Sequence, residues 1–302
     1  MAEIFSFGIS NLYITKTKPE FQPQLLLLKD LFRHFNKAPL SQTNAVHLRL
    51  CPADTSGFLK NSFKLFSTPL CQVYQNGCFR ICIYSREHKV LIRQHHGQIK
   101  ISVQAPSDEL TDEILYLLFL SFSGELLDRQ GWHRIHSAGT VENAKASVYP
   151  RASLYGKSNY TLNYLESRTG AVLGDENVLT DGRQVAAFAT AIHLKGDRQE
   201  KTSSPFYFAR RQKKLWGERY LFLIPAERVS PPTGDFSLYF KNILQMFLFS
   251  LQFPLGLGVV QMREFMIRPD NFYHLIFIFL RRLKTLVYLL PRMKLGDFKS
   301  DL

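Results

Sequence analysis

Cysteine and acidic residues are scarce in this chain, and both shortages narrow the class of protein it can be. Its 302 residues include four cysteines, all in the first third of the sequence: Cys51, Cys71, Cys78 and Cys82. Their spacing contains no paired Cys-x-x-Cys motif, which argues against a zinc site and favours buried thiols in strands. The segment Met1–Ser10 lacks the basic start and long apolar run of an export signal. Together these absences predict a cytoplasmic bacterial protein, with any membrane contact peripheral at the inner membrane.

The shortage of acidic residues leaves a strongly basic chain. Lysine and arginine number 38 against 25 aspartates and glutamates, which gives a formal net charge of +13. From Lys201 to the end there are 16 basic and 7 acidic residues. Such a surplus is typical of a solvated basic surface, or of attraction to an anionic membrane, an acidic or phosphorylated partner, or nucleic acid. The 45% hydrophobic content excludes a disordered chain.

Residues 1–105 form a predicted β-rich N-terminal region. Three segments alternate apolar and polar residues, which is the pattern of half-buried strands. They are Cys71–Tyr74, Phe79–Tyr84 and Lys89–Arg93. Gln75-Asn76-Gly77 joins the first two, and Asn-Gly is typical of a hairpin turn because both residues tolerate positive φ. Leu25–Phe35 has apolar residues at helical spacing and is predicted to be the helix of this region.

Residues 106–235 are predicted to be an α/β core. A long apolar helix is expected over Asp108–Arg129, with Ser107 as a candidate N-cap. Gly131–Lys195 then alternates strand, loop, helix and strand, which favours an α/β arrangement. Phe206–Phe208 and Arg219–Ile224 are predicted to pair as a hairpin with a basic loop between them. Aromatic and basic residues also interleave there, but the hairpin explains them without nucleic acid, which is therefore not a favoured partner.

Residues 236–302 are predicted to be an apolar, basic and helical region that packs on the core. Asn242–Met262 carries no formal charge and is long enough to span a bilayer. Its glutamines, together with Pro254, Gly256 and Gly258, favour two segments buried against the core instead. Leu275–Leu290 is interrupted by basic residues, so an amphipathic helix on the core or on a membrane surface fits better.

The segment Lys145–Glu176 contains the pattern most closely tied to chemistry. An apolar strand, Ala146–Tyr149, runs into a turn that ends at Gly156-Lys157-Ser158. An amphipathic segment closed by Gly170 follows, and a second apolar run then leads to Asp175-Glu176. This order brings a lysine, a hydroxyl and two carboxylates to one edge of a sheet, where a nucleotide triphosphate and its magnesium would need them.

Compared with the phosphate-loop pattern G-x-x-x-x-G-K-[ST], this turn is degenerate. Such a loop works because its backbone N–H groups and the following helix N-terminus face the phosphates, while lysine adds a mobile positive charge. Here Arg151 occupies the position of the first glycine. The ionic groups remain in place, and the glycine-rich cradle is partly lost.

These residues resemble the HPr serine kinase/phosphorylase family, in particular its shorter HPr-kinase-like relatives from bacterial gene clusters. The resemblance covers about Gly131–Lys195 with good order and spacing, and it is only suggestive elsewhere. The matching stretches are His136-Ser137-Ala138, Gly156-Lys157-Ser158, Gly170–Glu176, Val178-Leu179, Asp181-Gly182 and Ala191–Lys195. It implies a phosphoenolpyruvate-carboxykinase-like core with loop-bound ATP, a β-rich front and a helical C-terminal part.

The resemblance also implies roles for particular residues. Lys157 would contact the β- and γ-phosphates of ATP, and Ser158 would coordinate Mg²⁺. Asp175 and Glu176 match the paired aspartates that organise the metal and act as base toward a protein or peptide serine. The remaining matches are His136, on the strand before the loop, and the loop positions Ser153 and Gly156, which would line the nucleotide. Ring-shaped homo-oligomers are typical of HPr kinases.

The departures from the family leave a second hypothesis open. Leu154 as well as Arg151 replaces a glycine, Tyr155 replaces a small residue and Asn159 replaces a threonine. A side chain at a position that needs positive φ costs about 1–2 kcal/mol and limits how closely backbone approaches phosphate. The alternative function is therefore a catalytically inactive, pseudokinase-type scaffold that binds a protein partner or an anionic membrane surface.

Each of these candidate residues also has an ordinary structural explanation. The Gly-Lys-Ser turn is equally consistent with a plain helix N-terminus. The acidic pair fits a solvated turn after a strand, and a lone histidine is most often a core residue. Only their order along the chain favours a common site.

Overall fold

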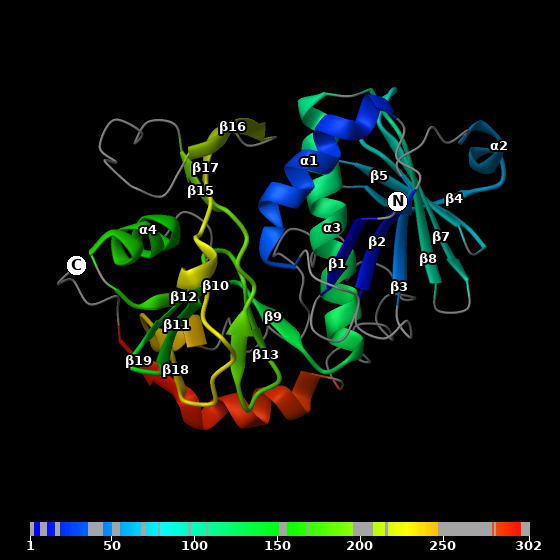
Figure 1. The fold of residues 1–302 in the computed structure, drawn as a ribbon. Coiled ribbons are helices and arrows are strands. Elements are labelled where there is room, and N and C mark those ends of the chain that lie inside the picture. The colour runs from blue at the N-terminus through cyan, green and yellow to red at the C-terminus, as the bar shows by residue number, and fades with distance from the viewer. Residues whose placement is uncertain are drawn as a thin grey trace. The chain divides into compact units, whose positions relative to one another are not determined.

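The computed structural model describes residues 3–6, 11–15, 19–35, 45–49, 55–67, 71–77, 79–95, 98–106, 108–150, 156–167, 169–195, 208–214, 217–246, 280 and 282–296. The chain forms two compact units. The first comprises Met1–Gln130, and most of the chain from Gly131 onward forms the second. Each unit combines helices with β-sheet (Figure 1). The protein is therefore a mixed α/β protein, as the sequence predicted at that level.

The first unit contains an eight-stranded mixed sheet. Its spatial order is β1-β2-β3-β8-β7-β6-β5-β4, with β2, β3 and β8 parallel and the other neighbours antiparallel. The strands are β1 (Glu3–Ser6), β2 (Asn11–Thr15), β3 (Ala45–Arg49), β4 (Phe63–Ser67), β5 (Gln72–Asn76), β6 (Phe79–Ile83), β7 (Lys89–His95) and β8 (Gln98–Gln104). The predicted hairpin between β5 and β6 is present and Gly77 has φ +54°, but Asn76, which was predicted to lie in the turn, is the last residue of β5 and pairs with Phe79. A short helix, α2 (Ser56–Leu59), precedes β4.

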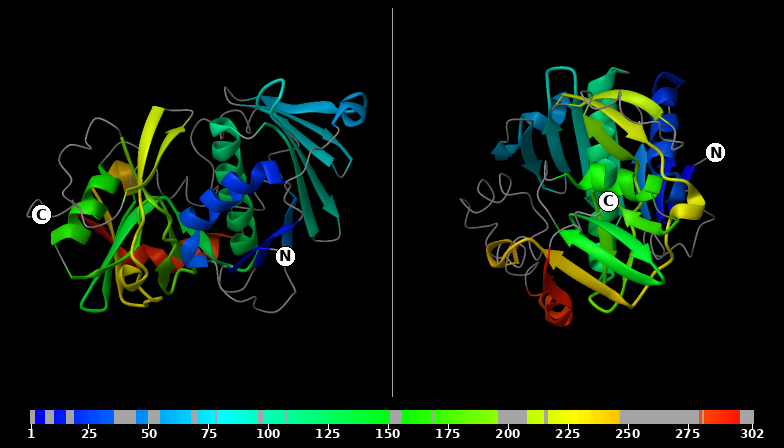
Figure 2. Two further views of the ribbon diagram at one scale, coloured as in Figure 1. Left: turned by 45° about the horizontal axis from the view of Figure 1, so that its top comes forward. Right: turned by 90° about the vertical axis from the view of Figure 1, so that its left-hand side faces the viewer.

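Two helices cover one face of this sheet, as two further views show (Figure 2). They are α1 (Gln22–Leu31) and α3 (Glu109–Arg129), with short 3-10 turns at Pro19–Phe21 and Arg33–Phe35. The fully buried Phe32 ring, next to α1, lies 4.1 Å from the Phe119 ring of α3 between centroids. The N-cap of α3 is Asp108, whose carboxylate accepts from the Thr111 N–H, and the predicted cap Ser107 lies outside the described residues.

The second unit is built on a five-stranded sheet of order β12-β10-β11-β18-β19. The strands are β10 (Ser137–Glu142), β11 (Lys145–Pro150), β12 (Ala171–Gly174), β18 (Phe236–Phe240) and β19 (Met293–Leu295). Strand β10 is antiparallel to both β11 and β12, while β18 is parallel to β11 and to β19. The β10–β11 hairpin turns through Asn143 and Ala144, both with positive φ, the backbone of a two-residue primed turn.

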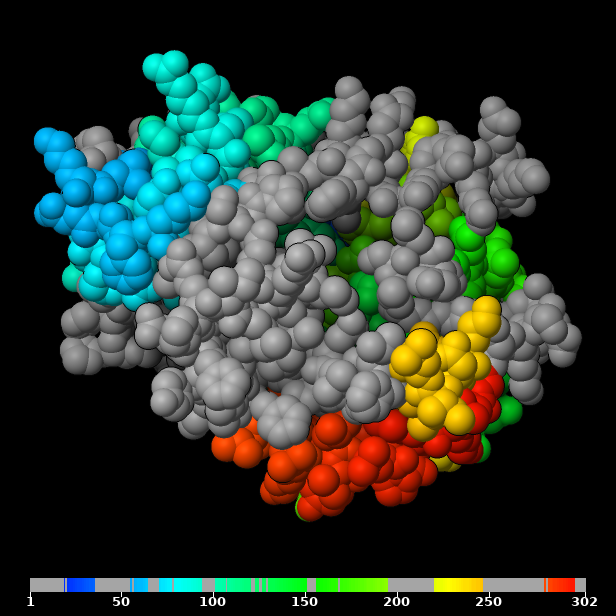
Figure 3. Space-filling view, turned by 180° about the vertical axis from the view of Figure 1, so that it is seen from behind, coloured from blue at the N-terminus to red at the C-terminus, as the bar shows by residue number. Residues whose placement is uncertain are grey.

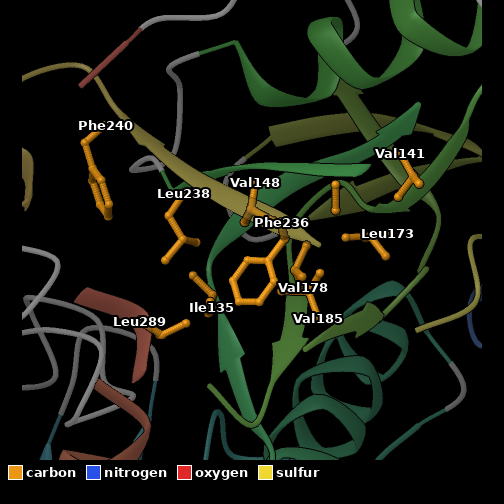
Figure 4. Close-up of a cluster of buried hydrophobic side chains, with 11 residues drawn as sticks. Ile135, Val141, Val148, Leu173, Val178, Val185, Phe236, Leu238, Phe240 and Leu289 are labelled. Atoms are coloured by element: carbon orange, nitrogen blue, oxygen red, sulfur yellow. The ribbon is translucent and has the colours of Figure 1, made fainter. Parts of the chain in front are cut away.

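Two apolar cores lie on opposite faces of this sheet, because alternate residues of a strand point to opposite sides. On β12, Val172 joins the core under the helix α4 (Lys157–Ser167), and Leu173 joins the other core. Every second residue of β18 enters that other core: Phe236, Leu238 and Phe240. Leu289, from a helical stretch over 282–289, packs there as well (Figure 4). Helix α4 and the C-terminal helix therefore cover opposite faces (Figure 1).

Two three-stranded sheets complete the second unit. One has the order β14-β13-β9 and the other β15-β17-β16. Their strands are β9 (His133–Ile135), β13 (Val178–Thr180), β14 (Val185–Ala187), β15 (Ile192–Lys195), β16 (Phe208–Lys214) and β17 (Gly217–Phe222). The predicted hairpin is present, but its basic run is strand β16 and not a loop, because Arg210–Lys214 pairs along β17. A 3-10 turn at Ala226–Arg228 leads toward β18.

The unit boundary differs from the predicted one at residue 105. Helix α3 belongs to the first unit, where it packs on α1, and residues 236–240 form a strand inside the core sheet. In the C-terminal region the described helical residues are 243–246, 280 and 282–289, followed by a 3-10 turn at Leu290–Arg292. Most of Asn242–Met262 lies outside the described residues. Among the residues that are described, no helix is long and apolar enough to cross a membrane.

Candidate functional site

Three strands of the five-stranded sheet bring the predicted residues to one edge. Because β10 runs antiparallel to both of its neighbours, β11 and β12 run parallel to each other, and their carboxyl ends lie at the edge where β10 begins. Ser137 of β10 pairs with Pro150, the last residue of β11, and Gly139 pairs with Gly174, the last residue of β12. Ligand sites of α/β sheets occur outside the carboxyl ends of their strands.

Helix α4 begins at this edge. Gly156 has φ +80°, a conformation that suits glycine, and its carbonyl accepts the first helical hydrogen bond, from the Tyr160 N–H at 3.0 Å. Lys157 and Ser158 are therefore the first two helical residues, whose N–H groups have no partner inside the helix. The helix dipole places partial positive charge at this end. The geometry gives an anion-attracting end to the helix beside the strand edge.

The acidic pair occupies a tight turn after β12. A Cβ at Gly174 would overlap the Asn177 carbonyl oxygen, so only glycine fits this close approach. The Ser137 N–H donates to the Glu176 carbonyl at 3.2 Å, which fixes the turn against the first residue of β10. This bond places Asp175 and Glu176 beside the start of β10.

Asp175 is fully buried and is held by two hydroxyls of α4. Ser158 Oγ donates to Oδ2 at 2.8 Å, and Thr161 Oγ1 lies 3.2 Å from Oδ1. Burial is the largest cause that raises the Asp175 pKa from 3.8 to about 6, and the Glu176 charge raises it further. The Ser158 bond, the Lys157 charge and the Thr161 bond oppose that rise. This carboxyl group therefore titrates close to neutral pH.

The Lys157 amine lies in the same cluster, against the histidine that precedes β10. Its Nζ is 3.0 Å from Nε2 of His136. An ammonium group has only donors, so lysine donates and the imidazole accepts. The Lys157 side chain is buried, which keeps its charge in the interior of the cluster.

The His136 ring titrates well below its ordinary range. Although much of the residue's surface is exposed, protein groups crowd the ring, and this loss of water is the largest cause that lowers its pKa to about 4. The Lys157 charge lowers the pKa further, whereas Glu176 opposes both. His136 is neutral at pH 7 and can accept from the lysine.

A tyrosine cluster adjoins the helix start. The ring of Tyr149, at the end of β11, lies 5.0 Å from that of Tyr160 on α4 and 5.5 Å from that of Tyr239 on β18. Burial, and secondly a hydrogen bond with Tyr160, raise the Tyr149 pKa above its ordinary value. These contacts hold the first turn of α4 against the ends of two strands.

The structure thus gathers Gly156, Lys157, Ser158, Asp175, Glu176 and His136 at one edge. Ser153, together with Arg151, Leu154 and Tyr155, lies outside the described residues. Sequence reasoning missed Thr161, whose hydroxyl lies within hydrogen-bond distance of the Asp175 carboxylate and the Lys157 carbonyl. Its position four residues after Lys157, on the same helix face, was the available signal.

The carboxylate and hydroxyl oxygens of this cluster suit a cation that prefers oxygen ligands and also binds phosphate groups. In the part of the chain that the structure describes, no group of three or more His, Cys, Asp or Glu side chains could hold a metal. Mg²⁺ does not need one, because it is bound by one or two carboxylates plus waters and substrate phosphates. The Asp175 carboxylate and the Ser158 hydroxyl are ligands of that kind.

No protein-family model matches this chain, and no curated protein matches it either. The resemblance to HPr kinases therefore remains a prediction.

Proposed function

We propose that this chain is an HPr-kinase-like protein that binds ATP with Mg²⁺ and transfers phosphate to a hydroxyl, such as a serine of a protein or peptide. The phosphoenolpyruvate-carboxykinase-like assignment of the core is part of the same proposal. The observation that carries it is the convergence of Lys157 and Ser158, at the start of α4, with Asp175 and Glu176 at one sheet edge. Phosphoryl transfer depends on positioning and charge stabilisation, which such groups supply.

The positive groups of this edge would bind the phosphates. The N–H groups at the start of α4 and the Lys157 ammonium provide them. Because Lys157 now donates to the neutral His136, its amine would move from the imidazole to a phosphate oxygen on binding. Before nucleotide binds, His136 would orient the lysine by accepting its hydrogen bond, which a neutral imidazole can do and a charged one cannot.

Asp175 and Ser158 would hold the metal, and Asp175 or Glu176 would take the proton of the acceptor hydroxyl. When bound, Mg²⁺ neutralises charge on the phosphate oxygens. A carboxyl group with a pKa of about 6 is ionised above that pH and still accepts a proton readily. The hydroxyl oxygen would form the new bond to phosphorus while the bond to the nucleoside diphosphate breaks.

Calorimetry with ATP, with and without Mg²⁺, tests this proposal. We expect millimolar or tighter binding that improves with Mg²⁺ and is lost in Lys157→Met, which keeps the length of the side chain. Lys145→Met is the matched control, because this exposed lysine is the first residue of β11, at the end of that strand away from the site. Absence of ATP binding by the native protein, or equal binding by Lys157→Met, would refute the proposal.

One observation favours the inactive alternative. The polar groups of the edge already satisfy one another: Lys157 donates to His136, and Ser158 donates to Asp175. Arg151 and Leu154 stand where the family has glycines. The hydrogen-bonded cluster could then serve only to stabilise the fold, and the chain would act as a scaffold. Restoring both glycines separates the two functions. Nucleotide binding that appears only in Arg151→Gly/Leu154→Gly supports the scaffold, and an unchanged measurable affinity supports the kinase.

A further inference from the structure

The C-terminal helix of the second unit exposes an apolar stripe. Leu280, Leu283, Val287 and Leu290 are 58%, 39%, 55% and 54% exposed. The four-residue spacing of Leu283 and Val287 puts both on one side of the helix over 282–289, and Leu280 and Leu290 lie just beyond its two ends. Isolated exposed leucines are common on proteins, whereas a continuous stripe marks a contact surface.

This stripe is not the face with which the helix packs on its own unit. Leu289 is fully buried, Leu286 packs against the same core, and Thr285 is buried too. A Cβ at Gly182 would come within 2.9 Å of the Thr285 carbonyl oxygen, so the helix backbone lies close against that turn. The helix is thus already docked, and the stripe faces away from the core.

Positive charge borders the stripe. Residues 271–296 contain no acidic residue, and of their described basic residues Arg282 is buried and Arg292 donates to the Gly234 carbonyl. Lys284 and Lys294 are exposed. The exposed Arg183 guanidinium lies 5.1 Å from the centre of the Tyr288 ring, which adds another cation beside the helix. Lysine and arginine at the rim of an apolar face extend their charges to lipid headgroups, and tyrosine favours that interface as well.

A second exposed apolar pair comes from the helical residues 243–246. Ile243 and Leu244 are 72% and 65% exposed. In the space-filling view the described residues of this segment, in yellow, adjoin the red C-terminal segment on the same face (Figure 3). The apolar surface is therefore wider than one helix.

We propose that this face docks on an anionic lipid bilayer, with the helix over 282–289 lying in the plane of the headgroups. An apolar stripe with a basic border is the composition of interfacial helices. The basic border selects an anionic bilayer rather than an acid-lined protein groove, because lipid headgroups present negative charge along the whole length of the stripe. This inference goes beyond nucleotide binding and does not depend on it.

Sedimentation of the full chain with vesicles tests the inference. We expect strong binding to vesicles that contain phosphatidylglycerol and weak binding to vesicles of pure phosphatidylcholine. Binding to the anionic vesicles should weaken as salt is added. Leu283→Asp/Val287→Asp should weaken binding about 100-fold or more, since it places two charges in the stripe. Lys284→Glu should weaken it about tenfold by removing one contact and adding repulsion.

Leu26→Asp is the matched control, because Leu26 is 53% exposed on α1 of the other unit and should leave vesicle binding unchanged. Three results would overturn the inference: no sedimentation with anionic vesicles at low salt, full binding by the Leu283→Asp/Val287→Asp variant, or equal loss in Leu26→Asp. Light scattering identifies the rival occupant. A dimer that the double variant dissociates, without vesicle binding, would assign the stripe to a second copy of the chain.

Discussion

Replacing Asp175 by asparagine should stabilise the protein near neutral pH while it removes the proposed metal ligand. The carboxyl group is fully buried and its pKa is about 6 rather than 3.8. Ionising it in the folded protein therefore costs about 3 kcal/mol more than in the unfolded chain. Asparagine keeps the shape without the charge. Its amide can retain one acceptor for Ser158 or Thr161, and we allow about 1 kcal/mol for the bond it cannot keep.

The sign of the pH dependence follows from the raised pKa. Below the unfolded value of about 4 both states are protonated and the penalty vanishes, and it grows until the pH passes the folded value of about 6. From the two pKa values, the penalty is about 2 kcal/mol at about pH 5 and about 3 kcal/mol at about pH 8. We therefore expect Asp175→Asn to raise the free energy of unfolding by about 1 kcal/mol at the lower pH and about 2 kcal/mol at the higher.

Urea unfolding followed by tryptophan fluorescence measures this difference. Trp132 belongs to the second unit, so its emission reports on the unit that contains the site. Asp235→Asn is the control, because its exposed carboxylate should change stability by less than about 0.5 kcal/mol. A variant that is less stable at the higher pH, or a gain that does not grow with pH, would show that Asp175 is not a strained buried acid.

Three further outcomes are expected. Gly170→Ala should lower the unfolding free energy by about 1–3 kcal/mol in urea titrations, because a Cβ there would overlap the Tyr164 hydroxyl and the Val141 carbonyl oxygen; an unchanged value would contradict this close packing. In NMR titrations the pKa of His136 should rise from about 4 toward 6.5 in Lys157→Met, since a neighbouring positive charge is removed. A lower pKa in the variant would show that the Lys157 charge does not depress the His136 pKa. Ala144→Gly should raise the thermal midpoint by relieving about 0.5–1 kcal/mol of strain at φ +62°, and calorimetry checks the sign.

Local sequence patterns predicted several elements in both units, including those that form the site. Alternation and a flanking Asn-Gly turn predicted β5 and β6, and the order of strand, turn, helix and acidic pair predicted β11, α4 and β12. The basic run Arg210–Lys214 was predicted as a loop, because its charges obscure the alternation of a strand. Pairing along β17, which supplies its backbone partners, decided its conformation.

The sequence by itself determined which groups could act here. The turn at Gly156 and the start of α4 at Lys157 and Ser158 are local features, and residues that are adjacent in the sequence determine them. Only the tertiary structure decided that β10 lies between β11 and β12, which makes them parallel and brings His136 and Asp175 to the same edge. Strand pairing joins residues far apart in the chain, and no local periodicity records it. Burial of Asp175, and with it a pKa near neutrality, is likewise a property of the packed fold.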